Sequence, residues 1–296
     1  MGALIGNFES EEEMAAKSGT VLITGCSSGI GHATALRLAK SGWSVYATAR
    51  RLESIADLGD AGCKTLALDV TDENSMVAAV AAVEEAEGAV GALVNNAGYS
   101  QSGAVESIPM EAIRRQFETN VLGLIRMSQL VMPGMRRAGD GRIVNISSIG
   151  GKVVFPGGGI YHATKHAVEA ISDAMRYESA GFGIQVVCVE PGLIKTGFGD
   201  TAVGSIAGDL DVEGPYAKFN QQVARITAGA YEGGLSKLGG GPDSVAKVIE
   251  KALSARSPRT RYRVTPSAKL VLGQRKIVSD RIWDRLMSAQ YPRPGA

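Results

Sequence analysis

The stretch TVLITGCSSGIGHA, residues 20–33, decides the fold of this chain. An apolar run rich in β-branched residues is followed at once by Gly25, Gly29 and Gly31, and then by a helical pattern. Gly25 permits a tight turn, while Gly29 and Gly31 let the backbone and the helix approach a pyrophosphate. The free N–H groups and the positive dipole end of a helix N-terminus bind such an anion. The stretch therefore predicts a dinucleotide-binding strand–turn–helix unit, with a plain tight turn as the alternative.

Short apolar runs and helical stretches alternate along most of the chain. The runs are rich in Val and Ile and lie at 20–24, 44–48, 64–68, 91–95, 141–146 and 184–190. Continuous apolar strands separated by helices predict a parallel sheet that is covered by helices on both faces. Thr71 and Asp72 supply N-cap chemistry for one of the intervening helices. We therefore expect a doubly wound α/β fold.

The composition changes after the sixth apolar run. Residues 197–241 are rich in glycine and polar side chains, and they follow the last strand of the expected nucleotide-binding unit. Long loops in compact domains are usually functional or disordered, so this segment is either a mobile surface insertion or a lid over a substrate cleft. Its position directly after the strand favours the lid.

The segments that follow complete the expected domain. A helix at 243–255, a short strand at 261–265 and a basic amphipathic tail helix at 274–288 come after the insertion. We expect the basic side chains of the tail, Arg275, Lys276, Arg281 and Arg285, to form a solvated face, with a membrane or nucleic-acid patch as the alternative. Residues 1–18 read as a polar N-terminal extension, so the expected organisation is one cofactor-binding domain over 19–296.

Composition argues against several functional classes. The 31 basic and 30 acidic residues of this 296-residue chain leave a net charge of +1, so we expect no nucleic-acid partner. Cys26, Cys63 and Cys188 are widely separated, which predicts buried thiols in a reducing compartment rather than disulfides or a metal site. No apolar run approaches the roughly 18 residues needed for a transmembrane segment, and no secretory signal pattern is present. The expectation is a soluble, cytoplasmic protein.

The run SSIGGKVVFPGGGIYHATK, residues 147–165, carries candidate catalytic residues. On a helix, Tyr161 and Lys165 project from one face because they are four residues apart. An ammonium about 4 Å from a phenol stabilises the phenolate by roughly 4 kcal/mol, which lowers the phenol pKa by up to about three units. That shift brings a tyrosine into the range of general acid–base catalysis. Ser148 adds a hydroxyl for the reacting oxygen, with Ser147 as the alternative; by itself such a pair is more often ordinary helix surface.

Several motifs occur together in one order: TGCSSGIG (24–31), NNAG (95–98), NVLG (120–123), Ser148, YHATK (161–165) and PGLIKT (191–196). In this order and spacing the chain resembles the short-chain dehydrogenase/reductase family over about residues 19–265. The resemblance implies a Rossmann-type parallel sheet of about seven strands in the order 3-2-1-4-5-6-7, flanked by helices, that binds a nicotinamide dinucleotide.

The resemblance also implies a role for each catalytic position. Asn120, Ser148, Tyr161 and Lys165 match the family's catalytic tetrad. Tyr161 would exchange a proton with the substrate oxygen, and Ser148 would hydrogen-bond that oxygen. Lys165 would lower the pKa of Tyr161 and hold the ribose hydroxyls of the cofactor, while Asn120 would anchor a water that links Lys165 to solvent. His32, His162 and His166 match no catalytic position, and we expect them to be structural.

Further positions are implied to contact the cofactor. The pair Asp69–Val70 is similar to the pair that flanks the adenine ring, and Asn95 belongs to the segment that stabilises the sheet. The remaining positions are Gly25, Ser27, Ser28, Gly29, Ile30, Gly31, Asn96, Ala97, Gly98, Tyr161, Lys165, Pro191, Gly192, Ile194 and Thr196. No metal is expected.

The end of the second strand, VYATARR (45–51), indicates which nicotinamide cofactor is used. An enzyme that prefers NAD needs an acid at this strand end to accept from the ribose 2′-hydroxyl, and near Ala49 none is present. A 2′-phosphate instead pairs with guanidinium groups. We predict that Arg50 is the main 2′-phosphate ligand, assisted by Ser27, Ser28 and Arg51. NADP(H) is thus the preferred cofactor and NAD(H) remains possible; a solvated basic turn is the alternative.

The glycine motif and VYATARR together are most similar to the branch that contains 17β-hydroxysteroid and retinol dehydrogenases. The apolar candidates for the substrate pocket are Val153, Val154, Phe155, Leu193 and Phe198. We therefore expect an NADP-dependent carbonyl reductase or alcohol dehydrogenase that acts on a small hydrophobic substrate. The alternatives are an NAD-dependent dehydrogenase of the same family and a non-catalytic NADP-binding regulatory protein. The resemblance also implies a homodimer or homotetramer through helices at 111–136 and 161–180.

Overall fold

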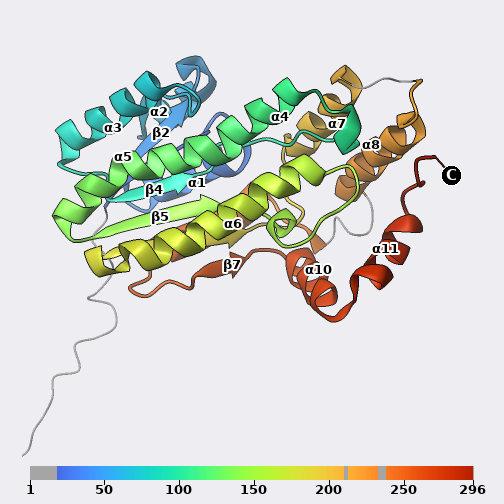
Figure 1. Ribbon diagram of the computed structural model, residues 1–296. Helices are drawn as coiled ribbons and strands as arrows, with labels where there is room; N and C mark the ends of the chain where they lie inside the picture. The colour runs from blue at the N-terminus through green and yellow to red at the C-terminus, as the bar shows by residue number, and fades with distance from the viewer. Residues whose placement is uncertain (1–18, 210–212, 233–237, 296) are drawn as a thin grey trace, which may run out of the picture.

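A parallel sheet forms the centre of the molecule, as the computed structural model shows for residues 19–209, 213–232 and 238–295 (Figure 1). Its seven strands lie in the order β3-β2-β1-β4-β5-β6-β7, and every neighbouring pair is parallel. The strands are β1 Thr20–Ile23, β2 Ser44–Ala49, β3 Lys64–Ala67, β4 Ala92–Asn95, β5 Gly141–Ile146, β6 Ile184–Glu190 and β7 Arg261–Arg263. The predicted fold class and strand order are confirmed.

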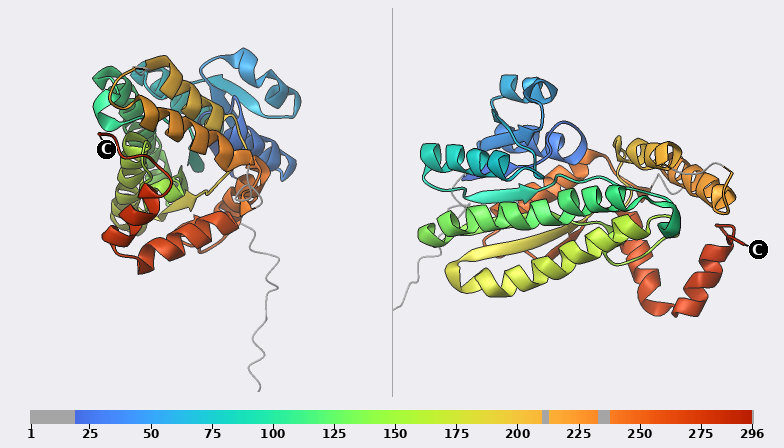
Figure 2. Two further views of the ribbon diagram at one scale, coloured as in Figure 1. Left: turned by 90° about the vertical axis from the view of Figure 1, so that its right-hand side faces the viewer. Right: turned by 45° about the horizontal axis from the view of Figure 1, so that its top comes forward.

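Helices cover both faces of this sheet (Figure 2). One layer contains α1 Gly29–Lys40, α2 Ala56–Asp60 and α9 Pro242–Ser254, and the other contains α3 Glu73–Glu87, α4 Met110–Phe117, α5 Gly123–Ala138 and α6 Gly159–Ser179. Side chains alternate between the faces along each strand. Val21 and Ile23 accordingly pack into a core with α1 and α9, while Leu22 packs into a second core with α3 and α5. The sheet is therefore buried on both sides.

A π-helical turn separates α4 from α5. The sequence suggests one helix over 111–136, but the five residues Glu118–Leu122 form this wider turn between the two α-helices. Such turns are rare and occur frequently at functional sites. Asn120, a predicted catalytic residue, lies in it and is buried.

The predicted lid segment contains two helices, α7 Phe198–Asp209 and α8 Ala217–Glu232. The high glycine and polar content of 197–241 conceals a helical apolar spacing, because Ala202 and Ile206, one turn apart, are both buried. Ile206 packs in one small cluster with Val223 of α8 and with Tyr291 near the end of the chain. The two helices lie beyond the carboxyl ends of the strands (Figure 1).

The predicted tail helix at 274–288 is wrong, because two helices occupy this region. α10 Pro266–Ile277 begins earlier, where the Thr265 hydroxyl caps it by accepting a hydrogen bond from Ala268 N at 3.2 Å. For the same reason β7 ends at Arg263 and does not reach residue 265. Val278 then adopts an extended conformation, and α11 Asp280–Ser288 starts after it. The predicted extension at 1–18 lies outside the described residues.

Candidate active site

The turn between β1 and α1 leaves no room for a side chain at Gly25 or Gly31. Gly25 and Gly29 have φ angles of 72° and 61°, in the region that favours glycine. A Cβ on Gly31 would lie 2.4 Å from the carbonyl oxygen of Gly25 and 2.5 Å from Asn96 Nδ2. The start of α1 therefore packs directly against the turn.

Hydrogen bonds from the end of β4 hold this turn in place. Asn96 Nδ2 donates to the carbonyl oxygens of Thr24 and Gly25, both at 2.9 Å. The Thr24 hydroxyl accepts from the backbone N–H groups of Asn96 and Ala97, both at 3.0 Å. Ser28 precedes α1 with an extended backbone, and its side chain does not cap the helix. The first N–H groups of α1 thus have no side-chain cap at their own N-terminus, which suits the binding of a phosphate.

A cavity of about 1360 Å³ opens in front of this turn and collects most of the predicted site residues. The predicted positions that line it are Gly25, Ser27, Ser28, Gly29, Ile30, Arg50, Asp69, Val70, Asn96, Ala97, Gly98, Ser148, Tyr161, Lys165, Pro191, Gly192, Ile194 and Thr196. Gly31, Arg51 and Asn120 do not belong to its described lining. Segments far apart in the chain thus meet at the carboxyl ends of the parallel strands, where doubly wound folds bind their ligands.

Tyr161 and Lys165 lie in the first turns of α6 and face this cavity together. Lys165 Nζ lies 5.8 Å from the centre of the Tyr161 ring and donates to the carbonyl oxygen of Ile146 at 2.8 Å. Burial lowers the pKa of Lys165 to about 8, and the nearby carboxylate of Glu169 opposes this shift. In its ammonium form Lys165 places a positive charge beside the Tyr161 ring.

Both serines that end β5 line the cavity, but their hydroxyls differ. Ser148 Oγ accepts a hydrogen bond from Gly150 N at 3.0 Å, so its own proton can point to another acceptor. Ser147 is 3% exposed, and its Oγ has no hydrogen-bond partner in the described part of the chain. The Ser148 hydroxyl is thus oriented by the backbone to donate, as a group that holds a reacting oxygen must be.

Asn120 is held behind the cavity wall by its full set of hydrogen bonds. Its Nδ2 donates to Tyr99 O at 2.9 Å and to Thr164 Oγ1 at 3.1 Å, and its Oδ1 accepts from Tyr99 N at 3.1 Å. A Cβ on Gly98 would come within 3.1 Å of Asn120 Oδ1 and 3.7 Å of Lys165 Nζ. The side chain therefore fixes the segment that follows β4 against the start of α6.

His162 lies closer to the site than its interpretation as a structural residue suggests. Its ring lines the cavity, 5.7 Å from the Tyr161 ring and 5.8 Å from the Phe155 ring. Phe155 N donates to His162 Nδ1 at 3.3 Å, so the ring fixes the loop before α6. Burial lowers the pKa of His162 to about 4, with His166 adding to the shift, so the imidazole is neutral at pH 7. The neutral His162 ring therefore packs against Phe155 and Tyr161 and positions the loop before α6.

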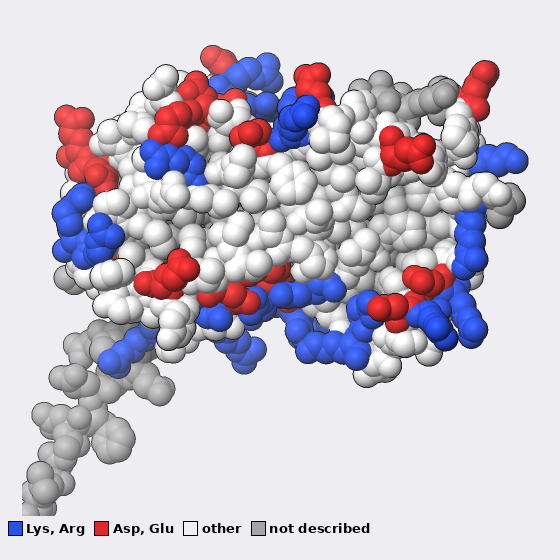
Figure 3. Space-filling model, viewed as in Figure 1, with Lys and Arg blue, Asp and Glu red and all other residues white. Residues whose placement is uncertain are grey.

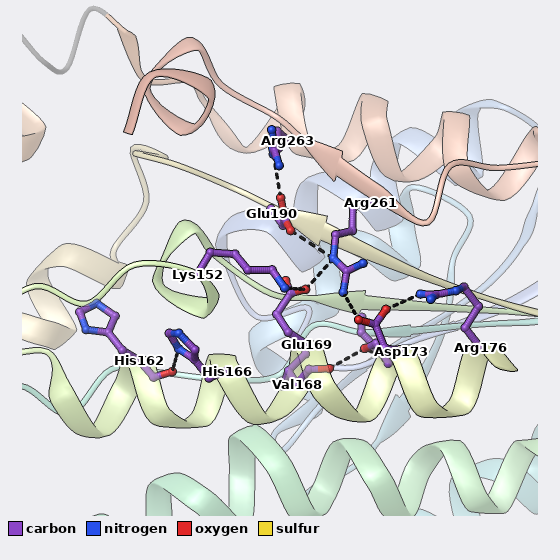
Figure 4. A network of polar contacts seen from close by, with 12 residues as sticks. Lys152, His162, His166, Val168, Glu169, Asp173, Arg176, Glu190, Arg261 and Arg263 are labelled. Carbon is purple, nitrogen blue, oxygen red and sulfur yellow. Dashed lines mark hydrogen bonds and ion pairs between the residues drawn. The ribbon is translucent and has the colours of Figure 1, made fainter. Parts of the chain in front are cut away.

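An ion network ties α6 to the sheet (Figure 4). Glu169, one turn after Lys165 and 3% exposed, accepts from Arg261 Nε at 2.8 Å and pairs with Lys152 Nζ at 3.0 Å. Asp173 accepts from Arg261 Nη2 at 2.6 Å. Removing one partner from such a buried pair is strongly destabilising because it leaves an uncompensated charge. Arg261 of β7 thus fastens the helix that carries Tyr161 and Lys165.

A second buried carboxylate belongs to the same network. Glu190, at the end of β6, is fully buried and pairs with Arg263 Nε at 3.3 Å. Burial raises the pKa of Glu190, and the neighbouring Glu169 raises it further. The network therefore lies between the ends of β6 and β7 and α6, the helix that carries Tyr161 and Lys165.

The end of β2 presents Arg50 to the cavity. Arg50 is exposed and lines the cavity, whereas Arg51 lies outside its described lining. The carbonyl oxygen of Arg51 instead accepts from Ser54 N at 3.2 Å and from Ser54 Oγ at 2.6 Å, which starts the short 3₁₀ helix Leu52–Ile55. At the end of β3, Asp69 Oδ1 accepts from both the backbone N–H and the hydroxyl of Thr71. The two loops form one side of the cavity.

The apolar candidates divide between cavity and elsewhere. Phe155 and Leu193 line the cavity. Val153 is 1% exposed but outside the described lining, and Val154 is 49% exposed on the surface. The side chain of Phe198 lies outside what the structure describes. Sequence reasoning missed other lining residues, namely Tyr99, Ser100, Gln101, Ser102, Val223, Ile226, Val271 and Tyr291. Only the NNAG motif just before Tyr99 gave a local signal for any of them.

Two classes of site find no support in the described residues. No group of three or more His, Cys, Asp or Glu side chains there is arranged to hold a metal ion. None of the helices in the described ranges is long and apolar enough to cross a membrane.

Comparison with known proteins identifies the class that this fold and site define. The family model described as short chain dehydrogenase matches residues 19–204. The chain belongs to this family, whose members named below are oxidoreductases and dehydrogenases.

Two curated relatives and one solved structure cover most of the chain. The uncharacterised oxidoreductase YusZ of Bacillus subtilis is 34% identical, over 90% of this chain and 96% of its own. Human 17-beta-hydroxysteroid dehydrogenase type 1 is 35% identical, over 83% of this chain and 77% of its own. A crystal structure of a short-chain dehydrogenase from Streptomyces avermitilis has a TM-score of 0.72 and 31% identity, over 91% of this chain and 96% of that one.

Two further solved structures contain nicotinamide dinucleotides. Serine dehydrogenase complexed with NADP+ has a TM-score of 0.72 and 26% identity, over 83% of this chain and 94% of that one. The 3-ketoacyl-(acyl-carrier-protein) reductase of Brucella melitensis complexed with NADH has a TM-score of 0.68 and 25% identity, over 83% and 96% of the two chains. Both structures bind a nicotinamide dinucleotide and share the fold of this chain, which supports a nicotinamide cofactor here.

Proposed function

We propose that this chain is an NADP-dependent oxidoreductase that interconverts a hydrophobic alcohol and its ketone or aldehyde. One observation carries the proposal: Ser148, Tyr161 and Lys165 line the same cavity as the glycine turn of β1 and α1. The proposed acid–base groups and the turn suited to phosphate binding thus line one cavity. The volume of about 1360 Å³ suits a dinucleotide together with a substrate.

The residues of this chain supply binding and proton transfer. A bound nicotinamide supplies or accepts the hydride. In reduction Tyr161 gives its phenolic proton to the carbonyl oxygen, and in oxidation its phenolate takes the proton of the alcohol. The Lys165 ammonium favours that phenolate electrostatically. The Ser148 hydroxyl, oriented by Gly150 N, donates to the reacting oxygen. Because these three groups meet at the reacting oxygen, the proton is transferred at that oxygen.

The preference for NADP(H) over NAD(H) rests on Arg50. The end of β2 carries this guanidinium at the edge of the cavity, in place of the acid that a ribose 2′-hydroxyl would need. Ser27 and Ser28 line the same side of the cavity and can add hydroxyl donors to a 2′-phosphate. The glycine turn, the uncapped start of α1 and Arg50 together fit the pyrophosphate and 2′-phosphate of such a cofactor.

The proposal of a hydrophobic substrate rests on the residues that line the other side of the cavity. Its lining there includes the apolar side chains of Phe155, Leu193, Val223, Ile226 and Tyr291. The relative that is named for a 17-beta-hydroxysteroid has the same family fold, which supports an apolar alcohol or ketone. We propose that α7 and α8 are the lid of this half, within a single cofactor-binding domain that spans 19–296.

Self-association is a further part of the proposed function. The surface of α5, α6 and the segments beside them exposes large apolar side chains: Leu122 is 47% exposed, Tyr177 87% and Phe182 49%. These support a homodimer or homotetramer that uses the helices around 111–136 and 161–180. Sedimentation equilibrium of the full chain measures this directly, and a monomer at micromolar concentration would contradict it.

The variant Tyr161→Phe tests the proposed mechanism. It should lose nearly all NADPH-dependent carbonyl reduction and still bind NADPH, as followed by the fluorescence of the reduced nicotinamide. The matched control is Tyr177→Phe, which removes the same hydroxyl from an exposed position of α6 and should keep full activity. Substantial turnover by Tyr161→Phe would refute Tyr161 as the acid and base, and NADPH binding without turnover by the wild type would favour the regulatory alternative.

A further inference from the structure

The two tail helices project from the body of the molecule as the arms of a V (Figures 1 and 2). α10 and α11 diverge from the short link at 278–279, and no residue of α11 is buried. One side of α11 contacts the rest of the molecule through Trp283, whose Nε1 donates to Val154 O at 3.2 Å and whose ring lies 5.8 Å from that of Phe155, and through Met287, which packs on the cluster of Ile206, Val223 and Tyr291. The outer faces of both arms are therefore open.

Each arm exposes two large aliphatic side chains. On α10, Leu270 is 46% exposed and Ile277 is 85% exposed. On α11, Ile282 and Leu286 are both 47% exposed and lie one turn apart. The last two sit on the side of α11 next to Trp283, so they continue its apolar face outward into solvent. Single exposed apolar side chains are normal on a protein surface, but two on the same side of each arm mark a candidate interaction surface.

Basic side chains lie directly beside these aliphatic ones. Lys269 and Lys276 precede Leu270 and Ile277 in the chain, and all four belong to the exposed side of α10. On α11, Arg281 and Arg285 are exposed and lie on the next strip of the helix to Ile282 and Leu286. None of these four basic residues forms an ion pair within the described ranges, whereas Arg275 is paired with Asp280.

The charge pattern is visible on the surface of the molecule. Blue side chains gather on both sides of an uncharged bulge at the lower right of Figure 3, where α10 and α11 lie in Figure 1, and red acidic side chains lie between them just above the bulge. Over residues 266–295, Lys269, Arg275, Lys276, Arg281, Arg285 and Arg293 stand against Asp280 and Asp284. The chain as a whole has a net charge of only +1, so positive charge is concentrated on this tail.

We infer that α10 and α11 dock the protein onto the surface of an anionic lipid bilayer. Aliphatic side chains bordered by Lys and Arg match the boundary between acyl chains and acidic headgroups. A second copy of this chain fits less well, because pairing this surface with itself would bring two net-basic surfaces together. The partner of these helices is therefore negatively charged at its surface and apolar just below that surface.

Docking in this way places the cavity beside the bilayer. Val271 of α10 lines the cavity, as do Gln290 and Tyr291 just after α11. The same short tail thus presents one side to the cavity and the other to the proposed membrane. Membrane binding itself does not depend on the proposed function, because it is measured without turnover.

The experiment is flotation of the full chain with vesicles of phosphatidylcholine alone and with an equimolar mixture of phosphatidylcholine and phosphatidylglycerol. We expect binding to the mixed vesicles that falls as salt is raised. In the double variant Arg281→Gln/Arg285→Gln, binding should fall about 25-fold, since each basic residue near an anionic surface contributes about fivefold. Ile282→Ser/Leu286→Ser should weaken it as well.

A matched pair on another helix is the control. Lys247 and Lys251 of α9 are exposed, one turn apart and not ion-paired in the described residues. Lys247→Gln/Lys251→Gln should therefore leave flotation unchanged. Retained NADPH binding and circular dichroism show that each variant is folded. Equal binding to neutral vesicles, no binding to either kind, an equal loss in the α9 control, or a change from dimer to monomer in the α11 variants would overturn the inference.

Discussion

The two sides of the cavity are built in different ways. The proposed cofactor wall comprises the glycine turn 25–31, Arg50 and the segment 96–98. Its glycines pack closely against neighbouring backbone, and the Asn96 side chain donates and the Thr24 hydroxyl accepts the hydrogen bonds that close it. The substrate wall, which comprises α7, α8 and residues 290–291, rests on a small cluster of Ile206, Val223 and Tyr291. A few side-chain hydrogen bonds join it to the rest.

Two hydrogen bonds attach α7 and α8 to the segment that follows β4. Ser102 N donates to Ser205 Oγ of α7 at 3.0 Å, and Ala104 N donates to Asn220 Oδ1 of α8 at 3.0 Å. Elements with few buried apolar contacts open at lower free energy than a core does. The proposed cofactor wall is therefore fixed by close backbone packing. The proposed substrate wall is held by a few separate hydrogen bonds, which single substitutions can remove one at a time.

The largest effect is expected where a methyl group enters the cofactor wall. In Gly31→Ala the new Cβ would lie 2.4 Å from Gly25 O, so the turn must shift. We expect NADPH affinity to fall by at least about 100-fold, because the turn no longer fits the pyrophosphate. The control is Gly204→Ala in α7, where no atom of the described residues lies within 4 Å of the added methyl. Calorimetric titration should show no loss of cofactor affinity there; equal losses would erase the contrast between the walls.

A pH dependence of stability is expected from His162, which lies where the two walls meet. Its pKa of about 4 in the folded protein is below the value of about 6.5 expected for an unfolded chain. Between these values the unfolded state binds the proton and the folded state does not, so stability falls as the pH falls. The loss approaches about 3 kcal/mol at and below pH 4.

Urea unfolding of the wild type and of His162→Gln between pH 4 and 7 measures this effect. The variant should be less stable overall but should lack this part of the pH slope. His32→Gln is the control, because His32 is partly exposed and pairs with Asp57 at the surface. Identical slopes for the wild type and His162→Gln would show that the buried ring is not the cause.

Cofactor preference is expected to depend on one charge in the cofactor wall. Arg50→Asp removes the guanidinium and adds a carboxylate that repels a 2′-phosphate. We expect NADPH affinity to fall about 30-fold while NADH affinity changes little, since charge-assisted contacts to the phosphate are lost. Arg51→Asp should have a smaller effect because Arg51 lies outside the described lining of the cavity. An unchanged ratio of NADPH to NADH affinity in Arg50→Asp would refute the phosphate assignment.

The smallest effect is expected in the substrate wall. Asn220→Ala removes the acceptor of Ala104 N and so loosens α8 from the segment that follows β4. We expect the KM for a carbonyl substrate to rise by about three- to tenfold, as the loss of one buried hydrogen bond implies. The NADPH dissociation constant should stay the same. If both constants rise together, the two walls are not independent.

Most residues predicted to contact the cofactor line one cavity, and the sequence could indicate them because the requirements of such a site are local. A tight turn, a helix start and a strand end each need particular residue types within a few positions, as residues 24–31 and 45–51 illustrate. Strand order followed from the family resemblance. The spacing of Tyr161 and Lys165 also identified two residues that the structure brings into one cavity.

The substrate wall was harder because distant segments build it. Tyr291 reaches the cavity only because α10 and α11 turn back toward it, and no local pattern marks that residue. The helical spacing of Ala202 and Ile206 was concealed by surrounding glycines. The break at Val278 was missed because the charged and apolar residues on either side continue a helical pattern, whereas Thr265 and Pro266 were an available start signal.

Transfer of deuterium from NADPH labelled at nicotinamide C4 tests the central claim most directly. The full chain is incubated with the labelled cofactor and a panel of steroid, retinoid and aliphatic carbonyls, and the products are analysed by mass spectrometry. The account predicts one deuterium on the carbinol carbon of a hydrophobic product, and almost no product with Tyr161→Phe. Tight NADPH binding with no deuterium in any product, or labelled product in equal amount from Tyr161→Phe, would contradict it.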